Sequence, residues 1–221
     1  MTGTSVVRPH WEVRSGGVFP SPHYTGVMGI RILRFDDSHR QPWANGAGST
    51  RELLQWPGGG QPWQWRLSIA DVDRDAPFSN FPGIDRILVL LSGDGLILRF
   101  ADGREERLDI PFAFARFPGE AKLSGGPLDG PTTDFNLMWR RDRFDAELWV
   151  RPMVGSIQLF SSPGETWVLH VAAGHADCEG GARLEAGDTL ISDDDGNARH
   201  LRLEGVGTAL VIRLQERQHD R

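Results

Sequence analysis

The sequence predicts an all-β protein built from two small barrels, and three observations lead to this prediction. Short stretches in which apolar and polar residues alternate recur along the 221 residues. Turn-forming residues, above all the 27 Gly and 14 Pro, separate these stretches at short intervals. Few windows keep the apolar spacing of a helix over three turns, because Gly or Pro interrupts most of them. Many short strands joined by turns are typical of a sandwich or barrel.

The strands of the first half are clearest around residues 86–100. Residues 86–91 are almost entirely apolar, as expected of a strand that is covered on both faces. Ser92-Gly93-Asp94-Gly95 is a turn sequence, and residues 96–100 return as the second strand of a hairpin. Further strands are expected, in chain order, at 30–35, 50–54, 65–70, 105–108, 112–117 and 134–139.

The second half repeats this organisation weakly. The apolar run at 167–171 closes on Gly174, as the run at 87–91 closes on Gly93. Glu185-Ala186-Gly187-Asp188 is a Gly-Asp turn of the kind common in cupin barrels. Strands are therefore expected at 167–171, 182–184, 189–192, 200–203 and 209–214.

These internal similarities predict a duplicated architecture. We expect a first cupin-like barrel at residues 28–148 and a second at residues 149–221. Residues 1–27 contain neither the apolar segment of a secretory signal nor any periodicity, so we expect a flexible N-terminal extension.

Composition narrows the possible functions. The net charge of −6 argues against a nucleic-acid partner, because phosphate binding needs a basic face. No apolar run reaches the roughly 18 residues of a membrane helix. The single cysteine, Cys178, can form no internal disulfide. We therefore expect a cytoplasmic protein with neither a nucleic-acid nor a membrane partner.

The histidines argue against a metal centre. None of the seven is part of a His-x-His pair, and none falls in the strands expected for the first barrel. The sequence also lacks a Gly-x-Ser-x-Gly elbow and a visible Cys–His nucleophile pair. We expect no metal and no cofactor, and a binding protein rather than an enzyme.

A Gly-rich segment at 43–52 opens the part of the chain where polar and aromatic residues concentrate. It lacks the GK[ST] ending of a phosphate loop and precedes a strand rather than a helix. Gly46 and Gly48 permit close backbone approach, while Trp43 offers a flat apolar wall. The segment is either a tight turn alone or a turn that also lines a pocket.

Arg66 and Ser68 share one face of the strand at 65–70, opposite its apolar residues. An arginine inside a small barrel must be paired, because a lone buried charge is very costly. Its partner is either an internal carboxylate, such as Glu52 or Asp85, or an anionic ligand that the guanidinium grips.

Aromatic and polar residues also flank the most apolar strand. Phe78 and Phe81 either plug a barrel mouth or line a ligand cavity, since small-ligand sites are mostly apolar with a few placed polar groups. Asp134, Asn136 and Met138 share one face of a later strand.

Four consecutive motifs resemble those of the HutD/Ves family. They are Trp43-x-Asn45-Gly46-x-Gly48-x-Thr50-x-Glu52, Trp65-Arg66-Leu67-Ser68-Ile69-Ala70, Phe78-Ser79-x-Phe81-Pro82-Gly83-Ile84-Asp85-Arg86 and Asp134-Phe135-Asn136-Leu137-Met138. They occur in the expected order and span most of 30–141. Ala47 departs from the pattern, because the family commonly has Gly there. The chain after about residue 150 matches only in general cupin style.

The resemblance implies a bicupin of two RmlC-like jelly-roll barrels, associated with histidine utilisation in bacteria. It implies that the protein senses or binds a small carboxylate such as formylglutamate, without a metal. The ligand-binding positions that it implies are Trp43, Asn45, Thr50, Glu52, Arg66, Ser68, Phe78, Phe81, Asp85, Arg86, Asp134, Asn136 and Met138.

Two other classes of function stay open. One is a metal-free isomerase or hydrolase in which Glu52 or Asp85 acts as general acid or base. The other is an interaction module or homodimer, since the chain has eight Trp and exposed aromatic patches mark interfaces.

Overall fold

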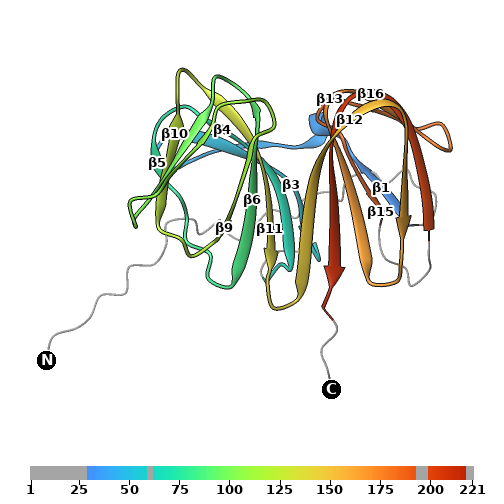
Figure 1. The fold of residues 1–221 in the computed structure, drawn as a ribbon, viewed down its shortest axis with the longest axis horizontal. Coiled ribbons are helices and arrows are strands. Elements are labelled where there is room, and N and C mark those ends of the chain that lie inside the picture. The colour runs from blue at the N-terminus through green and yellow to red at the C-terminus, as the bar shows by residue number, and fades with distance from the viewer. Residues whose placement is uncertain (1–28, 59–61, 193–198, 218–221) are drawn as a thin grey trace, which may run out of the picture.

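The computed structural model describes residues 29–58, 62–192 and 199–217, and their regular secondary structure is β-strand apart from one 3₁₀ turn at Phe35–Asp37. The strands form three sheets, arranged as two β units side by side (Figure 1). The all-β class predicted from the sequence is confirmed. The described residues contain no helical segment that could serve as a membrane span. The extension expected at 1–27 lies outside the described residues.

The first unit consists of two sheets that enclose an apolar core. A six-stranded sheet has the order β2-β3-β4-β11-β6-β9, and a four-stranded sheet has the order β5-β10-β7-β8. Side chains from both, such as Leu88, Leu98 and Leu123, meet between them. The strands are β2 (Arg40–Pro42), β3 (Gly48–Trp56), β4 (Trp65–Val72), β5 (Ala76–Pro77), β6 (Ile84–Ser92), β7 (Leu96–Phe100), β8 (Glu105–Leu108), β9 (Phe114–Pro118), β10 (Leu123–Pro127) and β11 (Thr132–Arg140).

The second unit is one sheet that bends around its own core. Its order is β1-β15-β13-β16-β12, and β14 pairs with β13. Its strands are β1 (Ile30–Leu33), β12 (Phe144–Ser161), β13 (Glu165–Cys178), β14 (Arg183–Glu185), β15 (Thr189–Ser192) and β16 (Arg199–Glu216). The two longest, β12 and β16, have 18 residues each and pair along their whole length.

Glycines mark the point where the long strands bend. A Cβ atom on Gly174 would lie 1.9 Å from the Val206 carbonyl oxygen, and one on Gly207 would lie 2.0 Å from that of Ala173. Both glycines have a positive φ, which a side chain would also disfavour. Only glycine therefore allows β13 and β16 to approach so closely, and residues on both sides of the bend pack into one core.

The two units meet through an apolar interface on the outer face of the six-stranded sheet of the first unit. Trp65, Phe135 and Trp139 from this face pack with Leu210 and Ile212 of β16. Because residues alternate between the faces of a strand, the same strands carry other side chains into the core of the first unit. The central strands are thus covered on both sides, as the apolar run at 86–91 predicted.

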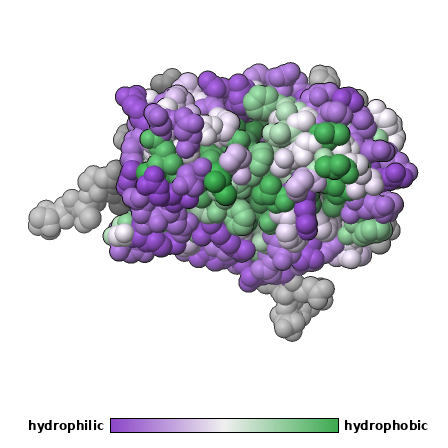
Figure 2. Space-filling model, turned by 45° about the horizontal axis from the view of Figure 1, so that its top comes forward, coloured by the Kyte–Doolittle hydropathy of each residue, from purple (hydrophilic) through white to green (hydrophobic). Residues whose placement is uncertain are grey.

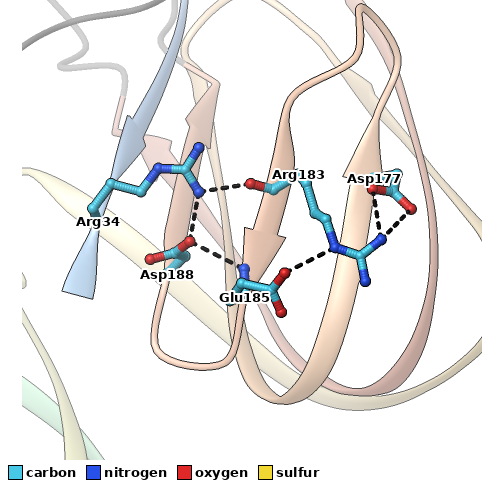
Figure 3. A network of polar contacts seen from close by, with 5 residues as sticks. All are labelled: Arg34, Asp177, Arg183, Glu185 and Asp188. Carbon is cyan, nitrogen blue, oxygen red and sulfur yellow. Dashed lines mark hydrogen bonds and ion pairs between the residues drawn. The ribbon is translucent and has the colours of Figure 1, made fainter. Parts of the chain in front are cut away.

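Asp188, in the Gly-Asp turn that the sequence predicts, ties the N-terminal strand to the second unit (Figure 3). Arg34 Nη1 donates to Asp188 Oδ2 at 2.6 Å and to the Arg183 carbonyl oxygen at 2.6 Å. The same carboxylate oxygen accepts the backbone N–H of Glu185 at 3.0 Å. Asp188 therefore closes its own turn and also anchors the chain that follows β1.

Two strands lie across the predicted division between the units. β1 pairs with β15, so residues assigned to the first barrel belong to the sheet of the second unit. β12 begins at Phe144 and continues without interruption through the expected boundary at 148/149. The division itself stays a prediction.

The surface is mainly hydrophilic, but apolar residues gather across the middle of the face shown in Figure 2. The large apolar side chains that the described residues leave exposed are Ile110, Phe114, Val154, Phe160 and Val206.

Candidate functional site

Most of the residues expected to bind a ligand converge on the inner face of the six-stranded sheet of the first unit. The strand register places Met138 between Arg66 and Arg86, and Asn136 beside Ser68. It also places Asp134 in the next row along the same face. We call this set the polar inner face: Thr50, Glu52, Arg66, Ser68, Arg86, Asp134, Asn136 and Met138.

Arg86 is the buried centre of the polar inner face, with only 6% of its surface exposed. Its Nε and Nη2 donate to Asn136 Oδ1 at 3.2 and 3.0 Å. Its guanidinium lies over the rings of Phe78, Phe117 and Phe81, at 4.9, 5.1 and 5.9 Å from their centroids. Among the described residues no carboxylate forms an ion pair with it. A buried cation in this position is suited to an anionic partner.

Asp134 lies beside Arg86 and is 1% exposed. Asn136 Nδ2 donates to Asp134 Oδ1 at 3.3 Å, so the amide connects the carboxyl group to the guanidinium. Burial raises the pKa of Asp134 to about 7, although the charge of Arg86 and the Asn136 hydrogen bond act in the opposite direction. Burial also lowers the pKa of Arg86 to about 10, so Arg86 remains a cation at neutral pH. Near neutrality, therefore, Asp134 exists in both protonation states.

The ion pair between Glu52 and Arg66 is the part of the polar inner face that solvent reaches. Arg66 Nε donates to Glu52 Oε2 at 3.0 Å, and their side chains are 19% and 39% exposed. Gln55 Nε2 donates to the same oxygen at 2.6 Å. Of the partners that the sequence left open for Arg66, the structure contains Glu52. An exposed pair of this kind contributes at most about 1 kcal/mol to stability.

Trp43 lies at the edge of the polar inner face, where its Nε1 donates to Thr50 Oγ1 at 2.8 Å. A Cβ atom on Gly48 would lie 3.0 Å from the Trp43 ring and 2.2 Å from the Asp71 carbonyl oxygen, so the position requires glycine. Asn45 is exposed, and its Oδ1 accepts the backbone N–H of Ala47 at 3.0 Å. The Gly-rich segment is thus a turn that Asn45 closes and that carries Trp43 to the site.

Asp85, like the exposed Asn45, is an expected site residue that the structure does not bring to this face. It follows the alternation of β6 onto the opposite side, where its Oδ1 lies 3.0 Å from Arg141 Nε. Arg141 also donates to Glu120, and these two ion pairs attach the turn before β10 to β6. Asp85 is therefore placed as a structural ion-pair partner.

Phe117 also contacts Arg86, although the sequence pattern does not single it out. It lies directly opposite Arg86 in the β6–β9 register. Alternation at 112–117 left open which phenylalanine faces inward. Phe112, with a φ of 64°, precedes the strand, and Phe114 faces the other way and is exposed. The register of β9 against β6 determines which phenylalanine faces Arg86, and this register cannot be predicted from one sequence.

The described residues contain no group of three or more His, Cys, Asp or Glu side chains placed to hold a metal ion. His170, in the second unit, is buried where the two units meet and packs at 4.8 Å from the ring of Phe135. Its Nδ1 lies 2.9 Å from Thr189 Oγ1, and burial lowers the pKa of His170 to about 4. This histidine is thus a neutral packing residue at physiological pH.

The model of the family described as HutD matches residues 36–211, which include the whole polar inner face. The chain belongs to the HutD family. It is 37% identical over 194 residues to an uncharacterised 21.2 kDa protein in the hutC 3′ region of Pseudomonas putida, a match that covers 85% of this chain and 98% of that protein. It is 32% identical to protein Ves of Citrobacter koseri, over 76% of this chain and 83% of Ves.

A solved structure of HutD from Pseudomonas fluorescens SBW25, described as a formate condition, superposes with a TM-score of 0.75 at 30% identity. The match covers 86% of this HutD-family chain and all of that one. The resemblance read from the four motifs and the predicted cupin-like fold are therefore confirmed.

Proposed function

We propose that this HutD-family chain is a metal-free binding protein for a small carboxylate, such as formylglutamate, and that it modulates histidine catabolism. The observation that supports this most directly is the buried guanidinium of Arg86, which no carboxylate of the described residues pairs. Burying a charge in this way is costly unless a partner compensates it. A ligand carboxylate would supply that partner, and the family's association with hut genes favours an intermediate of that pathway.

Two arginines at different depths suit a ligand with two carboxylates. Arg66 and Arg86 flank Met138 on neighbouring strands, so their Cα atoms lie two strand spacings apart, about 10 Å. Arg86 would hold one carboxylate on the buried side, and Arg66 would hold the other where solvent reaches the face. Formylglutamate is such a dicarboxylate.

Asp134 would make binding depend on pH. A carboxylate that joins Arg86 takes up the positive charge that now stabilises ionised Asp134. The Asp134 carboxyl group would then bind a proton and could donate it to the ligand in a hydrogen bond. Affinity should therefore rise as the pH falls through about 7, while a ligand carboxylate with an ordinary pKa stays ionised.

A thermal-shift screen against formylglutamate, urocanate, glutamate and histidine tests this proposal. A ligand at about 100 times its dissociation constant should raise the free energy of unfolding by about 2.7 kcal/mol. We expect the largest shift with formylglutamate and a smaller one for Arg66→Ala. Arg107→Ala, which removes an exposed arginine on β8, is the matched control and should behave as wild type. A screen without any shift would contradict the proposal.

One observation favours a second candidate, a metal-free isomerase or hydrolase. A buried carboxyl group with a pKa of about 7 is suited to general acid–base catalysis at neutral pH. Asp134 would then be the catalytic group, in place of Glu52 or Asp85, which the structure pairs with arginines. Asp134→Asn separates the candidates, because it would abolish turnover in an enzyme while a binding protein would still bind its ligand.

A further inference from the structure

A cavity lies in the second unit, and none of its lining residues belongs to the polar inner face. Its volume is about 400 Å³, within the range of small-molecule sites. Its lining comes largely from β12, on both sides of Gly155, whose φ is 95°. The change in strand direction there places Ile157 and Trp149 around one hollow.

The wall of this cavity is aromatic. Trp149 and Trp167 stack with their ring centroids 6.0 Å apart and their planes inclined by 21°. Val211, on the strand between them, and Ile157 extend the apolar surface. A flat or aliphatic ligand body would bury apolar area against these rings.

The polar groups of the cavity are hydrogen-bond donors. Arg151 is exposed and forms no ion pair with any described residue, whereas Arg213 on the adjacent strand pairs with both Glu147 and Glu165.

Gln158 adds to this set. It lines the cavity, and its Oε1 lies 3.2 Å from His200 Nε2, which leaves its amide N–H groups as donors. An unpaired guanidinium and an amide can both donate to the same kind of group, an anion rich in acceptors.

We propose that this cavity binds a small amphipathic carboxylate, with its apolar body against Trp149 and Trp167. Its carboxylate would accept hydrogen bonds from Arg151. The site is separate from the polar inner face and does not depend on the function proposed for it.

Calorimetric titration of the full chain with 3-phenylpropionate tests this site, with neutral 3-phenylpropionamide as the matched probe. We expect the acid to bind about tenfold more tightly than the amide, because only the acid can pair with Arg151. Arg151→Gln should weaken binding of the acid about tenfold and leave the melting temperature unchanged, since Arg151 is exposed. Trp167→Phe keeps an aromatic ring but removes part of the apolar surface against which the ligand body packs, and it should cost a smaller factor.

Two controls keep the cavity distinct from the first unit. Arg107→Gln removes an exposed arginine elsewhere and should bind the acid as wild type does. Arg86→Met removes the buried cation of the polar inner face and should also leave 3-phenylpropionate binding intact. The proposal is overturned if the acid does not bind up to about 10 mM. It is also overturned if acid and amide bind alike, if Arg151→Gln has no effect, or if Arg86→Met abolishes binding.

Discussion

Arg86 donates two hydrogen bonds to a single oxygen of Asn136, and the amide nitrogen of Asn136 donates in turn to Asp134. Asn136 thus holds the guanidinium in place without neutralising it. The carboxyl group that could neutralise Arg86 is so deeply buried that it binds a proton at a pH of about 7. Arg86 therefore keeps its positive charge without an ion-pair partner among the described residues, and this relationship underlies the predictions that follow.

Replacing Arg86 by methionine should abolish carboxylate binding without loss of stability. A buried charge is often no more stabilising than an apolar side chain of similar volume, and the rings of Phe78 and Phe117 would pack against the thioether. Formylglutamate affinity should fall by a factor of about 100 or more, as expected when a buried charged partner is lost. Calorimetry measures the change in affinity, and thermal denaturation measures the change in stability. A variant that unfolds at a much lower temperature would identify Arg86 as a structural residue instead.

Glu52→Gln should strengthen carboxylate binding. Glu52 forms an ion pair with Arg66 in the described structure, and its negative charge would repel an incoming anion. The amide keeps the size of the side chain but removes its charge, so affinity should rise several-fold, most clearly at low salt. Calorimetric titrations at two ionic strengths measure this. Unchanged or weaker affinity would mean that the ligand does not approach Arg66.

The stability difference between wild type and His170→Asn should depend on pH. The pKa of His170 is about 4 in the folded chain and about 6.5 in the unfolded chain. Between these two pH values His170 is therefore protonated in the unfolded chain but not in the folded one. His170 therefore costs stability progressively as the pH falls from 6.5 to 4.

The asparagine variant lacks this titration. It should be less stable than wild type at pH 7, because it loses the packing against Phe135. The difference in the free energy of unfolding between the two proteins should be smaller at pH 4.5. Urea denaturation at both values measures it. A deficit that stays constant would show that His170 titrates alike in both states.

Gly174→Ala should destabilise the second unit strongly. The new Cβ atom would lie 1.9 Å from a carbonyl oxygen in a backbone conformation that already disfavours a side chain, so a loss of about 3 kcal/mol or more is expected. Gly155→Ala is the matched control, because that glycine has a positive φ but open space around it, and it should cost only about 1 kcal/mol. Equal losses in chemical denaturation would show that the close approach of β13 and β16 is not what requires glycine.

Much of the fold could be predicted because local patterns determine it. Alternation within β4 and β11 predicts which residues of each strand share a face. The register between the two strands then places Arg66, Asn136 and Asp134 on the same face of the sheet. The long strand β12 could not be predicted, because Pro152 and Gly155 are residues that usually end a strand. Both are tolerated there, since β12 lies at the edge of its sheet and pairs with one neighbour.

The parts of the site that escaped prediction depend on pairing between distant strands. The choice of Phe117 over its neighbours follows from the register of β9 on β6. The partnership of Asp85 with Arg141 follows from the face of β6 that Asp85 occupies, which is opposite to the face occupied by its neighbour Arg86. The pKa of Asp134 follows from its burial, which only the packed structure establishes.

The measurement that tests the central claim most directly is calorimetric titration with formylglutamate at pH 6, 7 and 8, in pairs of buffers with different ionisation enthalpies, for wild type and Asp134→Asn. If the ligand carboxylate joins Arg86, wild type should take up a proton on binding and lose affinity above pH 7, by up to about tenfold per pH unit. Asp134→Asn should bind with no proton uptake and no such pH dependence. Binding to wild type that is independent of pH and buffer, or no binding at any pH, would contradict the placement of a carboxylate beside Arg86 and Asp134.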